Sequence, residues 1–169
     1  MTDKELIIAN VIGAGGGRIA GRVRLQKTLY LLDQMGMGSG FSYAYHHYGP
    51  YSAELSEAVA DATAFNLVHE FVDRRASDGV SFSIYESSHP HGGQSSRRLG
   101  ELDMSEASIA LERMQSCSST VLELAATIHW LRTREDISDW QAELRRRKGV
   151  KASCERTQQA VELLGKLGL

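Results

Sequence analysis

Three helical segments in a row, followed directly by a β-hairpin signal, dominate the first half of the sequence. Residues 67–75 and 80–86 have the composition of strands, and Asp78-Gly79 between them is a strong short-range hairpin signal. Three helices and then a hairpin is the element order of a winged helix-turn-helix, with the hairpin as the wing. We therefore expect a mainly α fold with a small β-hairpin, in which residues 1–86 form a winged-helix-like unit.

Start and stop signals bound each of the three predicted helices. Thr2 and Glu5 form a capping box for the first helix. The glycines at 13 and 15–17 end this helix and are expected to form a flexible connector to the next one. The second helix is expected over residues 21–35, because leucines recur there at helical spacing. Ser52 can cap the third helix, which we expect to continue to Ala64.

The remaining segments divide into a short strand, a loop and further helices. Residues 41–48 alternate in the manner of a strand, which Gly49-Pro50 is expected to break. Residues 87–102 are typical of a loop. We expect residues 103–169 to form a C-terminal helical extension packed on the first unit, with Asp103 and Glu106 as its capping pattern and a split at the serines of 116–119.

Composition narrows the classes of function. The net charge is −2 and the pI is about 6.3, so the chain lacks the basic field typical of a dedicated nucleic-acid-binding domain. Cys117 and Cys154 do not have metal-ligand spacing and are expected to be reduced thiols. Neither a signal peptide nor a run of apolar residues long enough for a membrane span is visible, so we expect a cytoplasmic protein with no membrane association.

Three motifs invite a catalytic or cofactor-binding interpretation. Residues 11–20 match a relaxed dinucleotide fingerprint, but a helix-capping box precedes them and no acidic residue follows at the required place. The His89-Pro90-His91 segment with Glu86 lacks a third metal ligand at a convincing spacing. His46 and His47 beside Tyr48 lack a nucleophile or carboxylate in the same motif. We therefore expect no enzyme activity, catalytic residue, cofactor or metal.

Charge also bears on nucleic-acid binding. In an ordinary helix-turn-helix the third helix enters the major groove, but here residues 52–64 carry three carboxylates and no Lys or Arg. The basic residues lie around the second helix and near the C-terminus instead. Three tyrosines of the second helix and of the Tyr-Gly-Pro-Tyr turn accompany them. The predicted contacts with a partner or a nucleic acid are Arg18, Arg22, Arg24, Lys27, Tyr30, Tyr48, Tyr51, Arg145, Arg146, Arg147 and Lys148.

Two N-terminal motifs carry a resemblance to a known family. They are Gly21-Arg22-x-Arg24-Leu25-Gln26-Lys27-x-Leu29-Tyr30-Leu31-Leu32 and Tyr48-Gly49-Pro50-Tyr51-Ser52-x-x-Leu55. Together with the C-terminal Trp140-x-x-Glu143-Leu144 pattern, they resemble the YwgA-like family of bacterial and archaeal proteins. The chain is more distantly similar to the Panacea domain of SocA-like antitoxins. That likeness implies neutralisation of a toxin by protein contact, or a proteolysis adaptor, and it implies no catalytic residues.

The shared residues allow two interpretations. Lys27, Tyr30, Tyr48 and Tyr51 are expected to meet where the second helix, the strand end and the third helix converge, because Pro50 sets the turn geometry. They form either a polar knot that defines the fold or a surface that binds a partner.

The functional hypothesis is a non-enzymatic binding module for protein–protein interaction, such as an antitoxin-like protein, an adaptor or a phage-defence accessory protein. The alternative is a nucleic-acid-binding transcriptional regulator that uses the basic second helix and the wing. A homodimer is also expected to be compatible with the sequence, since the C-terminal helices carry apolar stripes.

Overall fold

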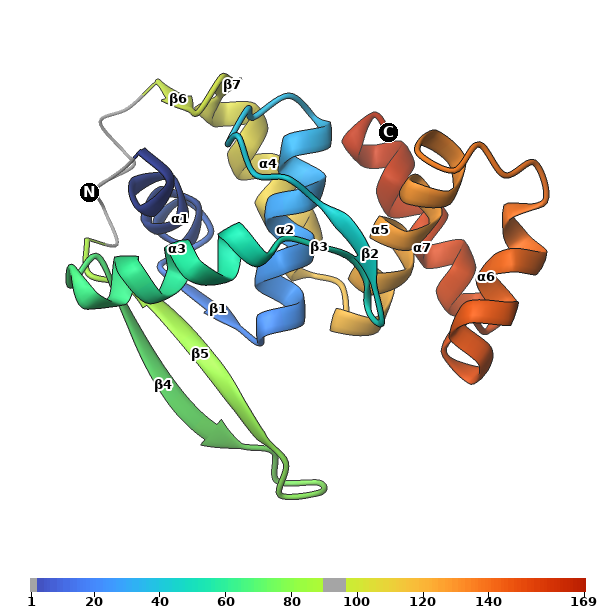
Figure 1. Cartoon of the computed structure of the whole chain (residues 1–169), viewed down its shortest axis with the longest axis horizontal. Helices are drawn as coiled ribbons and strands as arrows, with labels where there is room; N and C mark the ends of the chain where they lie inside the picture. Colours follow the sequence, from blue (N-terminus) through green and yellow to red (C-terminus); the bar gives the residue numbers. More distant parts are fainter. Residues whose placement is uncertain (1–2, 90–96) are drawn as a thin grey trace.

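The computed structural model describes residues 3–89 and 97–169, and it is mainly α-helical with small antiparallel sheets (Figure 1). The helices are α1 Asp3–Ala14, α2 Arg22–Gln34, α3 Ala53–Ala64, α4 Met104–Gln115, α5 Ser119–Thr133, α6 Trp140–Lys148, the short 3₁₀ helix η1 Gly149–Lys151, and α7 Cys154–Leu167. The strands are β1 Arg18–Ala20, β2 Ala44–His46, β3 Gly49–Tyr51, β4 Val68–Arg74, β5 Ser81–Ser87, β6 Arg98–Leu99 and β7 Leu102–Asp103. Among the described residues, none of these helices is long and apolar enough to cross a bilayer.

The largest sheet has three antiparallel strands in the order β1-β5-β4. The predicted hairpin is confirmed, because β4 and β5 pair along their whole length with Phe71 opposite Ile84. The hairpin projects away from the helices (Figure 1). The strand β1 was not predicted, since residues 15–17 were expected to be only a flexible connector. Three residues are too few to show an alternating pattern, and pairing with β5 defines this strand.

Two further hairpins correct the sequence-based expectations. Gly49-Pro50 does not end a strand but forms β3, which pairs with β2 so that Tyr45 lies opposite Pro50. An edge strand accepts proline because the missing N–H would face the unpaired side of the strand, where no neighbouring strand needs it. The segment 87–102 was expected to be a loop, yet β6 and β7 pair within it. Thr2, Pro90 and His91 lie outside the described residues, so the first capping box and the predicted His89–His91 segment are not described there.

Side-chain caps bound the helices largely as predicted. The Ser52 hydroxyl accepts a hydrogen bond from the Leu55 amide at the start of α3, and Asp103 caps α4 in the same way. The serine-rich stretch separates α4 from α5, whose N-cap is Ser118. Within the predicted C-terminal extension, α6 begins at Trp140, and the preceding Asp139 is its N-cap.

The core is continuous across both halves of the chain. Leu31 of α2, Leu124 of α5 and Leu164 of α7 belong to one buried cluster. The helix α5 is buried on nearly all sides, as expected for a central helix. The apolar stripe of α7, which suggested a dimer interface, is used inside this core: Leu163 and Leu167 are both buried. The C-terminal helices therefore position α5 against the β2–β3 hairpin.

A candidate binding surface beside the β4–β5 hairpin

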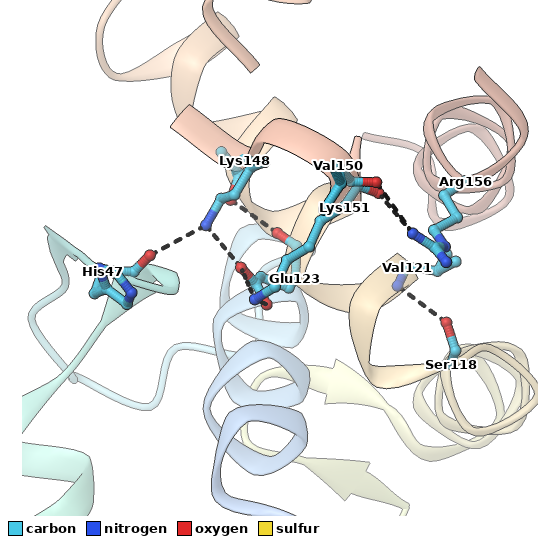
Figure 2. A network of polar contacts seen from close by, with 9 residues as sticks. His47, Ser118, Val121, Glu123, Lys148, Val150, Lys151 and Arg156 are labelled. Carbon is cyan, nitrogen blue, oxygen red and sulfur yellow. Dashed lines mark hydrogen bonds and ion pairs between the residues drawn. The ribbon is translucent and has the colours of Figure 1, made fainter. Parts of the chain in front are cut away.

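Two buried lysines from different helices donate hydrogen bonds to the β2–β3 hairpin. The Lys27 side chain of α2 is only 1% exposed, and its Nζ donates a hydrogen bond of 2.5 Å to the Pro50 carbonyl. Lys148, at the end of α6, is 7% exposed and donates to the His47 carbonyl at 3.4 Å (Figure 2). Both lysines therefore donate to main-chain oxygens of the same hairpin.

Glu123 of α5 is the carboxylate at the centre of this cluster. Its Oε1 accepts a hydrogen bond from Lys148 at 2.8 Å, and its Oε2 accepts one from Lys151 at 3.1 Å (Figure 2). The Glu123 side chain itself is almost completely buried. A buried carboxylate needs such partners, because taking an ion out of water costs several kcal/mol.

Burial also changes the proton affinity of the lysines. The pKa of Lys27 is lowered to about 8. Burial is the main cause and the nearby charge of Lys148 acts in the same direction, whereas the charge of Glu123 opposes them. Burial lowers the pKa of Lys148 as well, although its contact with Glu123 acts in the opposite direction. The cluster therefore holds lysine amines that are largely removed from water.

The predicted tyrosines do not form one common knot. Tyr30 is fully buried and its hydroxyl lies 2.9 Å from His129 Nδ1, so it packs inside the core and is not an accessible contact. The Tyr51 hydroxyl lies 2.9 Å from the Ser56 hydroxyl on α3. Tyr48 is half exposed, with Lys151 Nζ 4.9 Å from the centre of its ring. Of the three, Tyr48 is the most open to a partner.

The basic residues before and within α2 are mostly engaged inside the molecule. Arg24 donates to the carbonyls of Met114 and Cys117 at the C-terminal end of α4, which is a favourable place for a cation. Arg18 lies 3.8 Å from Glu86. Arg22 lies 3.4 Å from Glu70 but keeps most of its side chain in solvent. Lys27 is buried, as described above, so the expected basic face of the second helix is reduced mainly to Arg22.

The C-terminal basic run is likewise not a free cationic face. Arg147 makes ion pairs with Glu135 and Glu143, and its guanidinium lies 4.5 Å from the centre of the Tyr45 ring. Arg146 also pairs with Glu143, and these contacts lower the pKa of that carboxyl to about 2. Lys148 is buried. Arg145 and Arg146 are both exposed, and Arg146 is held by its ion pair with Glu143.

Two neighbouring hollows lie beside the β4–β5 hairpin. A pocket of about 440 Å³ lies between α2, α3 and the strands, with Leu55 and Val59 in its wall. A wider one of about 770 Å³ lies between the start of α2, the hairpin and the start of α5. Arg22, Val23 and Tyr48 line both. We call the combined lining of the two hollows the hairpin surface.

The hairpin surface is partly apolar and open to solvent. Val72 is 71% exposed and Val80 is 50% exposed, and both line the wider hollow. Lys151 and Arg75 border the same hollow. Exposed apolar side chains that gather around a hollow are more typical of binding sites than of ordinary surface.

Sequence reasoning did not identify Glu123 or the valines of the hairpin. A glutamate within the apolar stripe of residues 121–131 was the available signal for Glu123, because such a side chain must be buried with a partner. No sequence signal marked the hairpin valines as exposed, because Val72 occupies an alternating strand position that is equally typical of a core residue. Within residues 3–89 and 97–169, no cluster of three His, Cys, Asp or Glu side chains is arranged to hold a metal ion.

Comparison with known proteins identifies a relative. No protein-family model matches the chain. The chain is 30% identical over 120 residues to the protein named "Uncharacterized protein YwgA" from Bacillus subtilis (strain 168), and the match covers 71% of this chain and 70% of that protein. The chain belongs to the YwgA family. The resemblance that rested on the motifs of α2 and of the Tyr48–Ser52 turn is thereby confirmed for YwgA, whose printed name assigns no activity.

Proposed function

We propose that this YwgA-family chain is a non-enzymatic protein-binding module and that the hairpin surface is where it binds its partner. The observation that carries the proposal is the exposure of Val72 and Val80 beside a hollow of about 770 Å³. Apolar side chains left in water at such a place stabilise a complex when a partner covers them.

The N-terminal half supports this proposal through its element order. We interpret residues 3–87 as a winged-helix-like unit, because β1 lies between α1 and α2 and pairs with the hairpin that follows α3. In such a unit the hairpin is the wing and α3 is the helix that would meet a nucleic acid. The exposed side of α3 carries Glu54, Glu57 and Asp61, which phosphates would repel. This favours a protein partner.

The distant resemblance to Panacea domains of SocA-like antitoxins suggests the biological role. We propose an antitoxin-like, adaptor or phage-defence accessory function, in which the hairpin surface covers or recruits another protein. A homodimer is a less favoured arrangement, since the apolar stripe of α7 is buried in the core of the same chain.

Site-specific photocrosslinking in the native host tests the proposal. A photoreactive amino acid in place of Val72 should give a discrete protein adduct, and the same amino acid in place of Ile109, which is 50% exposed on α4, should not. Replacing Val80 with serine should weaken the adduct formed from position 72. Equal adducts from both positions, or none from position 72, would contradict the proposal.

The second candidate is a nucleic-acid-binding regulator, favoured by the winged-helix-like order and by Arg74 and Arg75 near the tip of the hairpin. Gel-shift titration at low salt tests it. Binding should fall steeply with added salt, because phosphate contacts release counterions. Charge reversal of Arg22 together with Arg75 should weaken binding, and absence of any shift for the unmodified protein would eliminate this candidate.

A further inference from the structure

We propose that the hairpin surface recognises an acidic peptide segment that also carries apolar side chains. The inference rests on the proposed protein-binding function and adds the chemistry of the partner. It follows from the balance of charges around the two hollows and from the apolar side chains that flank them.

Cations outnumber carboxylates around the hairpin surface. Five basic side chains lie there against the carboxylates of Glu70 and Glu123, although the whole chain has a net charge of −2. The five are Arg22, Arg24, Lys27, Arg75 and Lys151. The positive charge is therefore a local property of this surface on an otherwise acidic molecule, and it attracts anionic partners.

The internal contacts leave part of this charge unmatched. Glu70 pairs with Arg22, and Glu123 is already satisfied within the interior by Lys148. Lys151 shares Glu123 but keeps 42% of its side chain exposed at the rim. Arg24 and Lys27 donate to main-chain carbonyls, which carry no full charge. Arg75 is exposed as well, but it pairs with Asp78. A carboxylate from a partner would complete the pairing at Lys151 and Arg22, which solvent also reaches.

The apolar side chains of the surface favour an acidic peptide over a nucleic acid as the anionic partner. Val23, Val72 and Val80 line the wider hollow next to the exposed cations. A peptide supplies carboxylates and apolar side chains together, whereas a nucleic-acid backbone supplies phosphates and sugars. A long nucleic acid would in addition have to pass the acidic side of α3, where Glu57 and Asp61 are exposed.

Fluorescence anisotropy with the intact chain tests this inference. The probe is a short fluorescein-labelled peptide in which glutamates alternate with leucines, and the matched probe has lysines in place of the glutamates. We expect the acidic probe to bind, the basic probe not to bind, and the affinity to fall as salt rises. Replacing Arg22 and Lys151 together with glutamine should reduce the affinity for the acidic probe by about tenfold.

Matched variants separate this from a general charge effect. The double replacement of Arg132 and Lys166 with glutamine makes the same charge change on exposed parts of α5 and α7, and it should leave the affinity unchanged. Val72→Ser leaves every charge in place and should also weaken binding. The side chains replaced at Arg22 and Val72 are largely exposed, so we expect these variants to fold. Thermal unfolding of each variant verifies this.

The outcomes separate failure of this inference from failure of the proposed function. Lack of binding of the acidic probe, or equal binding of the basic probe, overturns the inference. A labelled single-stranded oligonucleotide that binds more tightly than the acidic probe and responds to the same variants also overturns it, in favour of phosphate recognition. If photocrosslinking at position 72 still captures a protein whose contact segment is not acidic, the protein-binding function stands and only the acidic chemistry is wrong.

Discussion

Replacing Glu123 with glutamine tests the buried charge cluster most directly. The substitution preserves the size of the side chain but removes the charge that faces Lys148 at 2.8 Å. Breaking a buried ion pair by removal of one partner costs about 3–5 kcal/mol, because the other charge stays uncompensated. Lys151 is partly exposed and can turn to water, so its share of the cost is small. We therefore expect the free energy of unfolding to fall by about 3 kcal/mol at neutral pH.

The pH dependence of this loss identifies its cause. Burial already lowers the pKa of Lys148 from 10.5, and Glu123 opposes that effect, so the substitution should lower the pKa of the lysine further. Between that lowered pKa and 10.5 the unfolded chain binds more protons than the folded one, and stability therefore rises with pH. The deficit of the Glu123→Gln variant should be largest at neutral pH and should shrink as the buried amine loses its proton.

Urea denaturation followed by circular dichroism measures both effects, at about pH 7 and about pH 9.5. Glu112→Gln, on the exposed side of α4, is the matched control and should be nearly neutral. The double variant with Lys148→Met removes both charges and should recover part of the loss. A deficit below about 1 kcal/mol at neutral pH, or one that grows as pH rises, would refute the reasoning.

Three further predictions concern the same region. The pKa of Lys27 is lowered to about 8, so stability should rise between pH 8 and 10.5, and Lys27→Met should flatten that part of a urea-measured stability curve. Gly49→Ala should lower the melting temperature and cost about 2 kcal/mol or more, because φ is +90° and the new Cβ would lie 2.6 Å from Thr127 Oγ1; an unchanged melting temperature would contradict this placement. Tyr30→Phe removes the 2.9 Å hydrogen bond to His129 and should cost about 1 kcal/mol in chemical denaturation, whereas an unchanged midpoint would mean that the bond adds nothing.

Much of the secondary structure could be predicted because its causes are local. Ser52 and Asp103 cap helices through amides two or three residues away, and Asp78-Gly79 turns a hairpin whose strands adjoin it. The strands β1, β3, β6 and β7 were not predicted because each is very short. Such strands are defined by the segment with which they pair, and no local pattern distinguishes them from a loop.

The candidate site could be predicted only in part. The motifs around Tyr48 and Lys27 include residues that line the surface we propose as the binding site, and the acidic third helix favoured a site other than the major groove. The basic residues were assigned by their charge, and charge alone does not reveal whether a side chain reaches solvent. Arg24 and Arg147 are engaged by carbonyls and carboxylates of other segments, so they do not form the basic faces that their sequence suggested.

By itself, the sequence determined most of the helices, the caps at Ser52 and Asp103, the β4–β5 hairpin and the family, since each of these depends on residues close together in the chain or on shared motifs. Only the tertiary structure decided which lysines are buried and which surface stays open. Lys148 meets the His47 carbonyl across 101 positions of the chain, and Glu123 meets Lys148 across 25. Those contacts exist because α5 packs between α2 and the C-terminal helices, and burial then turns ordinary surface residue types into an interior charge cluster.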